Sequence, residues 1–193
     1  MVQSRRGKAK RGVLETSLGV FPNFPTIIHG IAKATFSENV EKVQKSIIQA
    51  LRKLNGLTRK YPISLTSLTG TRSGRVGFEV GVAEGIYFNY LNDEVTRRLF
   101  ETLSSMKFFP LLDFLIIITY HYNSKGKKIH LNFDYHQLRF LFDSHELEIR
   151  LFHCKGIRRM PLDELFSRLM DSIAKEMKQR SMKPLNLREL HVL

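Results

Sequence analysis

The stretch Leu111–Tyr122 constrains the fold more than any other part of this sequence, because its side chains are apolar on both faces of an extended chain. A strand of that composition is typical of the centre of a sheet, where neighbouring elements cover both faces. The stretch is shorter than the roughly 18 to 20 apolar residues that cross a bilayer, and it contains Asp113. We therefore expect a soluble protein with no membrane contact, built around this strand.

Two hairpins are expected after the central strand. The first turns at Asn123–Gly126 and returns as Lys128–Phe133, and the second turns at Asp143–Ser144. Their registers follow from the alternation of apolar and polar side chains, because one face of the sheet is buried. The registers that sort the side chains in this way pair Ile118 with Leu131, Thr119 with His130 and Tyr120 with Ile129 in the first hairpin, and Leu138 with Ile149, Arg139 with Glu148 and Phe140 with Leu147 in the second.

The other elements are predicted from periodicity and from residues that start or stop helices. Strands are expected at Ile27–Phe36, Ile63–Leu68 and Val76–Val82. Three helices are expected. The first is capped by Ser37, and its apolar stripe runs from Val40 to Leu54 and stops at Asn55–Gly56. The second is capped by Asn92 and closed by Pro110, and the third is a long amphipathic helix opened by Pro161 that reaches Met177.

In chain order, these elements predict an α+β fold with an antiparallel sheet. Its start is a ferredoxin-like β-α-β-β-α-β arrangement, followed by a C-terminal β-meander and a long C-terminal helix. The alternative is a helix-grip fold, in which a curved antiparallel sheet wraps around the last helix. The expected division is a basic flexible arm and connector at residues 1–25, a single domain at residues 26–183 and a docked tail at residues 184–193.

Positive charge is concentrated in two stretches without acidic residues, 1–14 and 42–78, whose thirteen basic residues equal the formal net charge of +13. Folding gains nothing from such segregation, because like charges repel. Binding to a polyanion gains a great deal, since each neutralised phosphate releases counterions. The candidate contacts are Arg5, Arg6, Lys8, Lys10, Arg11, Lys42, Lys45, Arg52, Lys53, Arg59, Lys60, Arg72 and Arg75, with Lys155, Arg158 and Arg159 of a third basic turn.

RNA is the polyanion that the sequence favours, although DNA stays open. There is no helix-turn-helix, zinc-finger or basic-zipper pattern. The expected strand at residues 75–82 carries one aromatic residue, Phe78, where a base-stacking RNA-recognition motif has several. The sequence therefore favours recognition of a structured RNA through its phosphates and its shape over readout of single bases. The disordered N-terminal arm is expected to become ordered when it binds this RNA.

No pattern for catalysis, metal binding or a cofactor is expected. The glycines between residues 70 and 85 match neither a Walker A loop nor a dinucleotide fingerprint, and the seven histidines lack chelating spacing. Cys154 has no designated base, and a single cysteine indicates a reducing, cytoplasmic location.

The function expected from the sequence is therefore structural and non-enzymatic. The leading hypothesis is an RNA-binding component of a ribonucleoprotein particle, such as a ribosomal protein, whose partners are ribosomal RNA and neighbouring proteins. One alternative is a small-molecule-binding or enzymatic helix-grip domain, which requires an apolar cavity between the last helix and the sheet. The other is a protein-interaction adaptor that binds an acidic partner.

Overall fold

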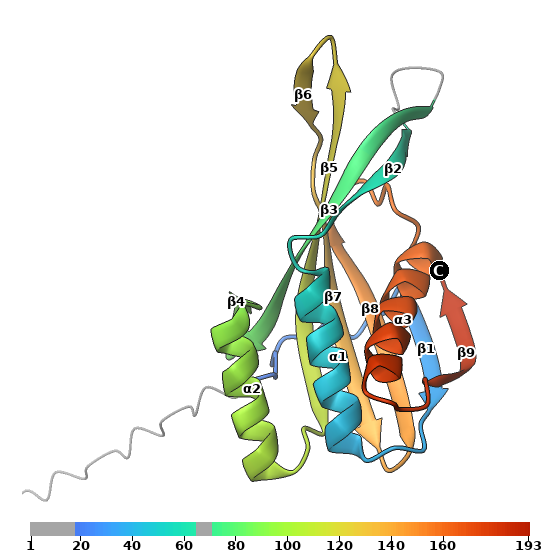
Figure 1. Ribbon diagram of the computed structural model, residues 1–193. Helices are drawn as coiled ribbons and strands as arrows, with labels where there is room; N and C mark the ends of the chain where they lie inside the picture. Colours follow the sequence, from blue (N-terminus) through green and yellow to red (C-terminus); the bar gives the residue numbers. More distant parts are fainter. Residues whose placement is uncertain (1–17, 65–70) are drawn as a thin grey trace, which may run out of the picture.

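A computed structural model of the chain describes residues 18–64 and 71–193. These form a curled antiparallel sheet with three helices (Figure 1). The helices are α1 (Val40–Leu54), α2 (Asp93–Met106) and α3 (Leu162–Gln179). The strands are β1 (Gly30–Thr35), β2 (Thr58–Ser64), β3 (Thr71–Glu84), β4 (Tyr87–Tyr90), β5 (Leu111–Ser124), β6 (Lys127–His130), β7 (Asp134–Asp143), β8 (Glu146–Lys155) and β9 (Asn186–Val192).

The strand order is β2-β3-β5-β7-β8-β1-β9, with β4 paired to β3 and β6 paired to β5. The apolar strand β5 lies in the interior of this sheet, between β3 and β7, as its sequence predicts. A ferredoxin-like start would place β1 beside β3, but β3 pairs with β5, and β1 pairs with β8 and β9. The reason is local: short connections make β5, β7 and β8 pair in chain order, so β1 completes the sheet beyond β8.

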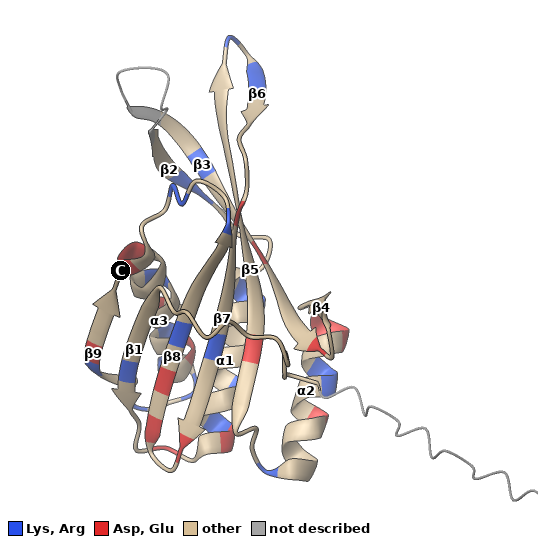
Figure 2. Ribbon diagram, turned by 180° about the vertical axis from the view of Figure 1, so that it is seen from behind, with Lys and Arg blue, Asp and Glu red and all other residues tan. Residues whose placement is uncertain are grey.

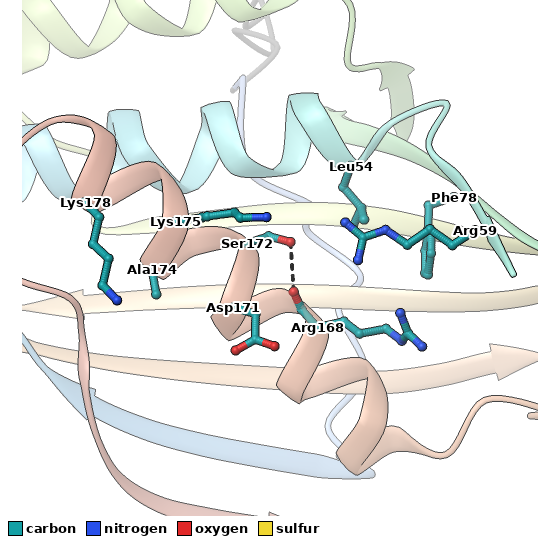
Figure 3. A pocket seen from close by; sticks show the side chains of 9 residues that line it. All are labelled: Leu54, Arg59, Phe78, Arg168, Asp171, Ser172, Ala174, Lys175 and Lys178. Atoms are coloured by element: carbon teal, nitrogen blue, oxygen red, sulfur yellow. Dashed lines mark hydrogen bonds between the residues drawn. The ribbon is translucent and has the colours of Figure 1, made fainter. Parts of the chain in front are cut away.

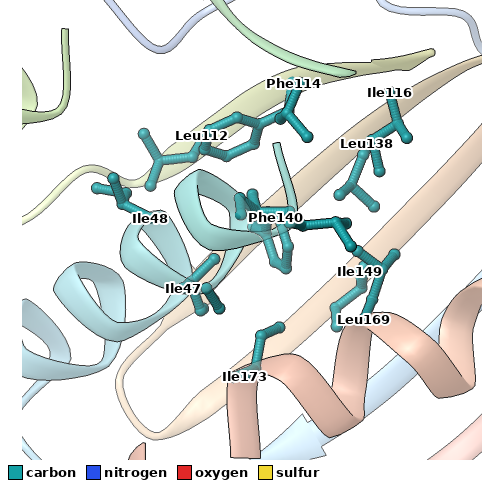
Figure 4. Packing of buried hydrophobic residues seen from close by; sticks show 14 of the residues in the cluster. Ile47, Ile48, Leu112, Phe114, Ile116, Leu138, Phe140, Ile149, Leu169 and Ile173 are labelled. Carbon is teal, nitrogen blue, oxygen red and sulfur yellow. The ribbon is translucent and has the colours of Figure 1, made fainter. Parts of the chain in front are cut away.

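Helices α1 and α3 pack side by side on one face of the sheet and enclose the core (Figures 1 and 4). Ile47 and Ile48 of α1 and Ile173 of α3 are at most 1% exposed, as are Phe140 and Ile149 of the facing strands. The side chain of Asn39 caps α1 by accepting a hydrogen bond from the backbone of Glu41. The expected Val40–Leu54 stripe and the start of α3 are confirmed, whereas the predicted cap of α1, Ser37, is wrong by two residues. Helix α3 is followed by a strand and is not the last element.

Both predicted hairpin registers are wrong by two residues. Tyr122, not Tyr120, pairs with Ile129, and Phe140 pairs with Ile149. In the first hairpin the chain turns within Lys125–Gly126, whose φ angles of 49° and 75° suit a tight two-residue turn. A shift of two residues leaves every side chain on the same face, so the apolar alternation could not distinguish the two registers.

Three further segments refine the expected organisation. The tail at residues 184–193 docks by forming β9, which extends the sheet beside β1. Part of the connector also lies against the sheet, since the backbone N–H of Phe21 donates to Asp113 at 2.7 Å. The expected strand Ile63–Leu68 is observed as β2, which ends at Ser64, and residues 65–70 lie outside the described part of the chain. None of the described helices is long and apolar enough to span a membrane.

Candidate nucleic-acid interface

Two adjacent hairpins, β2–β3 and β5–β6, extend beyond the part of the sheet that the helices cover (Figure 1). We call this projection the basic arm and define it as residues 58–64, 71–77 and 119–130. From here on the name refers to these residues and not to the N-terminal residues 1–25. These segments contain no aspartate or glutamate. Their basic residues are Arg59, Lys60, Arg72, Arg75, Lys125, Lys127 and Lys128, together with His121 and His130.

A row of four basic side chains crosses the basic arm. Lys60 pairs with Arg75, Arg75 with His121, and His121 with His130, so the four residues lie side by side on consecutive strands. Residues paired directly across a sheet share a face, and the spacing between strands gives the row a length of roughly 14 Å. The two imidazole rings are 5.7 Å apart between centroids.

The row lies on the face of the sheet that points away from the helices. Val76 and Tyr120, which neighbour the row along β3 and β5, are fully buried on the opposite face. Lys60, Arg75 and His130 are exposed, as is Lys128, which lies two residues before His130 on the same face. These groups are therefore accessible to solvent.

The positive charge of this row is not compensated by carboxylates. Within the described residues, Lys60, Arg75 and Lys128 form no ion pair. The pKa of His121 is lowered, first by partial burial and then by the positive charges of Lys128, His130 and Arg75. A bound phosphate would relieve this repulsion.

The remainder of the same face is electrically different (Figure 2). There the basic side chains have acidic partners: Lys33 with Glu189 at 3.0 Å and Arg150 with Glu148 at 2.5 Å. Arg139 likewise binds the buried carboxylate of Asp113 at 2.7 Å. Uncompensated charge on this face is thus concentrated on the basic arm.

Helix α1 contributes less free charge than its sequence suggests. Three of its candidate contacts are paired with carboxylates: Lys45 with Glu41, Arg52 with Asp93 and Lys53 with Glu176, at 2.6, 2.9 and 2.6 Å. Lys42 is exposed. Because α1 packs on the helix-covered face, these residues are not continuous with the row on the basic arm.

Of the next candidate contacts, Lys155 ends β8, and Arg158 and Arg159 lie in the following loop, which a buried carboxylate holds in place. Asp134 accepts hydrogen bonds from the backbone N–H groups of Arg158 and Arg159, each at 2.8 Å, and from the hydroxyl of Tyr120 at 2.8 Å. Since Tyr120 belongs to β5, this loop is fixed near the base of the basic arm. Lys155 and Arg158 are exposed there.

The other candidate residues fall outside the described structure. Arg5, Arg6, Lys8, Lys10 and Arg11 precede the first described residue. Arg72 belongs to β3, and its backbone pairs with that of Ile63 in β2. The side chain of Arg72 lies outside the described structure.

The sequence interpretation did not include the β5–β6 half of the arm, namely His121, Lys125, Lys127, Lys128 and His130. A signal was present, because residues 114–133 also lack acidic side chains. Only the pairing of β3 with β5 shows that this stretch adjoins Arg75.

Among the described residues, no group of three or more histidine, cysteine, aspartate or glutamate side chains is arranged to hold a metal ion. Comparisons of the chain with protein-family models, with curated proteins and with solved structures gave no match.

Proposed function

We propose that the protein is an RNA-binding, structural component of a ribonucleoprotein particle, and that the ribosome is the particle. The observation that carries this proposal is the uncompensated row of Lys60, Arg75, His121 and His130 on a projecting, carboxylate-free arm. Such an arm can enter a folded RNA while the paired charges of the body stay outside. Phosphate neutralisation then supplies the affinity.

The side chains around the row favour backbone and shape recognition over base stacking. The exposed face of the arm carries Ser73 and Asn123 beside the cations, whereas Phe78 and Tyr120 are buried on the other face. Hydroxyl and amide groups of this kind can hydrogen-bond to phosphates and 2′-hydroxyls. We therefore propose structured RNA as the partner, with the basic residues 5–11 as a second contact.

The salt dependence of RNA binding tests the arm directly. Binding of a structured RNA hairpin by R75Q/K128Q is compared with binding by K33Q/R150Q, since each variant loses one lysine and one arginine from the same face of the sheet. The logarithm of affinity against the logarithm of salt concentration should be less steep by about 1.5 to 2 for R75Q/K128Q, because two phosphate contacts are lost. K33Q/R150Q should keep the slope of the wild type. Equal slopes for all three proteins would reject the proposed site.

The particle is tested by sedimentation of a native extract at low and high salt, followed by detection of this chain. Co-migration with ribosomal subunits at low salt, and release at high salt, is the expected result. A chain that stays at the top of the gradient under both conditions would contradict the proposal. In the RNA-binding assay, deletion of residues 1–12 should also reduce the salt dependence of the affinity, because it removes the basic residues 5–11.

The second candidate function is that of a small-molecule-binding or enzymatic helix-grip domain, and the topology of the sheet supports it. We propose that the fold is a variant of the helix-grip arrangement, because the curled sheet continues from β8 to β1 and β9 and α3 packs on its helix-covered face. In this variant the space under α3 is filled by Phe166, Leu169 and Ile173, each 1% exposed. A small ligand would therefore bind beside α3, not beneath it.

A further inference from the structure

A cleft of about 360 Å³ lies between α3, the end of α1 and the start of the β2–β3 hairpin (Figure 3). This volume is at the lower end of the range of roughly 300 to 1,000 Å³ that is usual for small-molecule sites. The residues that line it are Arg59, Arg168, Lys175, Lys178, Asp171, Ser172, Leu54, Phe78 and Ala174.

The fold explains why these residues converge. Positions three or four apart lie on the same face of a helix, so Arg168, Ser172 and Lys175 line one side of α3. Arg59 reaches the cleft from β2, since it pairs with the buried Val76 and so points toward the helices. Arg168 is held in position by Glu164 at 2.6 Å.

The cleft is positively charged above an apolar floor. One carboxylate, that of Asp171, is among the residues that line it beside the four basic side chains. Among the described residues, Arg59, Lys175 and Lys178 have no ion-pair partner. Leu54 and Phe78, which are 5% and 2% exposed, form part of the floor. A ligand that fits must therefore join an anionic group to a flat or apolar body.

We propose that this cleft is a separate binding site for a nucleoside phosphate. Arg59 and Lys175 bind the phosphate by charge-assisted hydrogen bonds, and Lys178 adds positive charge at the far end of the cleft. The base or ribose packs on the floor, and the carboxylate of Asp171 accepts hydrogen bonds from the amino or hydroxyl groups of the ligand. This site is distinct from the row on the basic arm and shares only its affinity for phosphate.

The nucleoside phosphate can come from two sources. One is a free mononucleotide. The other is a nucleotide of an RNA strand that passes around the edge of the sheet at β2. This path is open because β2 is an edge strand, and its consecutive residues Arg59 and Lys60 point to opposite faces of the sheet. In the second case the cleft extends the proposed RNA interface from one face of the sheet to the other.

Calorimetric titration with a nucleoside monophosphate, the matching nucleoside and a short single-stranded RNA tests this inference. The wild type should bind the phosphorylated probe at least about tenfold more tightly than the nucleoside, and K175Q/K178Q should lose about tenfold in affinity. The control K107Q/K183Q removes two exposed lysines outside the cleft and should bind as the wild type does. Circular dichroism checks that both variants are folded.

The outcomes separate the two sources and the two sites. Binding of the monophosphate identifies a free nucleotide, whereas a loss of affinity seen only with the oligonucleotide identifies an RNA strand. R75Q/K128Q should bind the monophosphate normally even though its RNA affinity is reduced, so a failure of the arm proposal leaves this test intact. If K175Q/K178Q binds both probes as tightly as the control does, the cleft is not a nucleoside phosphate site.

Discussion

His136, on the inward face of β7, is predicted to make the fold sensitive to mild acid. It is 0% exposed, and neither of its ring nitrogens has a hydrogen-bond partner among the described residues. Its ring lies 5.0 Å from that of His153. Burial, and then the positive charge that His153 can carry, lowers the pKa of His136 from 6.5 to about 4.

The sign and size of the effect follow from this pKa. A value that is lower in the folded than in the unfolded chain means that folding stabilises the neutral imidazole. This contribution is complete above pH 6.5 and is lost as the pH falls from 6.5 to about 4. Between pH 7 and pH 4.5 the loss is about 2.5 kcal/mol, a large part of an unfolding free energy on the order of 5 to 15 kcal/mol.

The measurement is urea unfolding followed by circular dichroism at pH 7 and pH 4.5. Because His136→Leu removes the titrating group and keeps the site apolar, its unfolding free energy at pH 7 should lie within about 1.5 kcal/mol of the wild type. On going to pH 4.5, it should lose about 2.5 kcal/mol less than the wild type loses. His145→Leu, at an exposed position, is the matched control and should follow the wild type.

The comparison between variants is what decides the result, since other groups titrate over the same range in all three proteins. If His136→Leu and the wild type lose the same free energy between the two pH values, His136 is not a buried neutral imidazole, and the reasoning from its burial fails.

Three further predictions concern the interface and the elements that support it. RNA affinity should rise as the pH falls from 8 to 6, because burial and then neighbouring cations lower the pKa of His121 and a bound phosphate raises it again; His121→Asn should reduce this rise in binding assays at pH 6 and pH 8. Gly156→Ala should destabilise the protein by more than about 1 kcal/mol in urea unfolding, because φ is 115° and a Cβ atom would collide with Asp134. Arg139→Met should cost about 3 to 5 kcal/mol by the same assay, because it leaves the fully buried carboxylate of Asp113 without its cation; a loss below 1 kcal/mol would show that the pair is dispensable.

Local sequence signals were sufficient to predict that the three helices and the central strand exist. The stripe from Val40 to Leu54 and the stop at Asn55–Gly56 coincide with the bounds of α1, and Asn92 caps α2 by accepting a hydrogen bond from the backbone of Val95. These features depend on interactions between residues a few positions apart. Such interactions are present in any fold that the chain adopts.

Strand pairing was less accessible, for two physical reasons. A register shift of two residues keeps every side chain on its face, so the hydrophobic pattern that predicts a hairpin does not fix its register. The position of β1 at the far end of the sheet depends on which strand edges stay free after the hairpins have formed, as its pairing with β8 and β9 shows. That outcome is a property of the whole sheet.

The sequence by itself determined that this chain carries unbalanced positive charge in stretches without carboxylates, since charge and composition do not depend on folding. Only the tertiary structure decided where that charge is free. It brings Asp93 and Glu176 to α1, where they pair with Arg52 and Lys53 of that helix. It also joins the β2–β3 hairpin to the β5–β6 hairpin, where Lys60, Arg75 and Lys128 form no ion pair with any described residue. Whether a cation is neutralised depends on neighbours within a few ångströms, and long-range strand and helix packing chooses those neighbours.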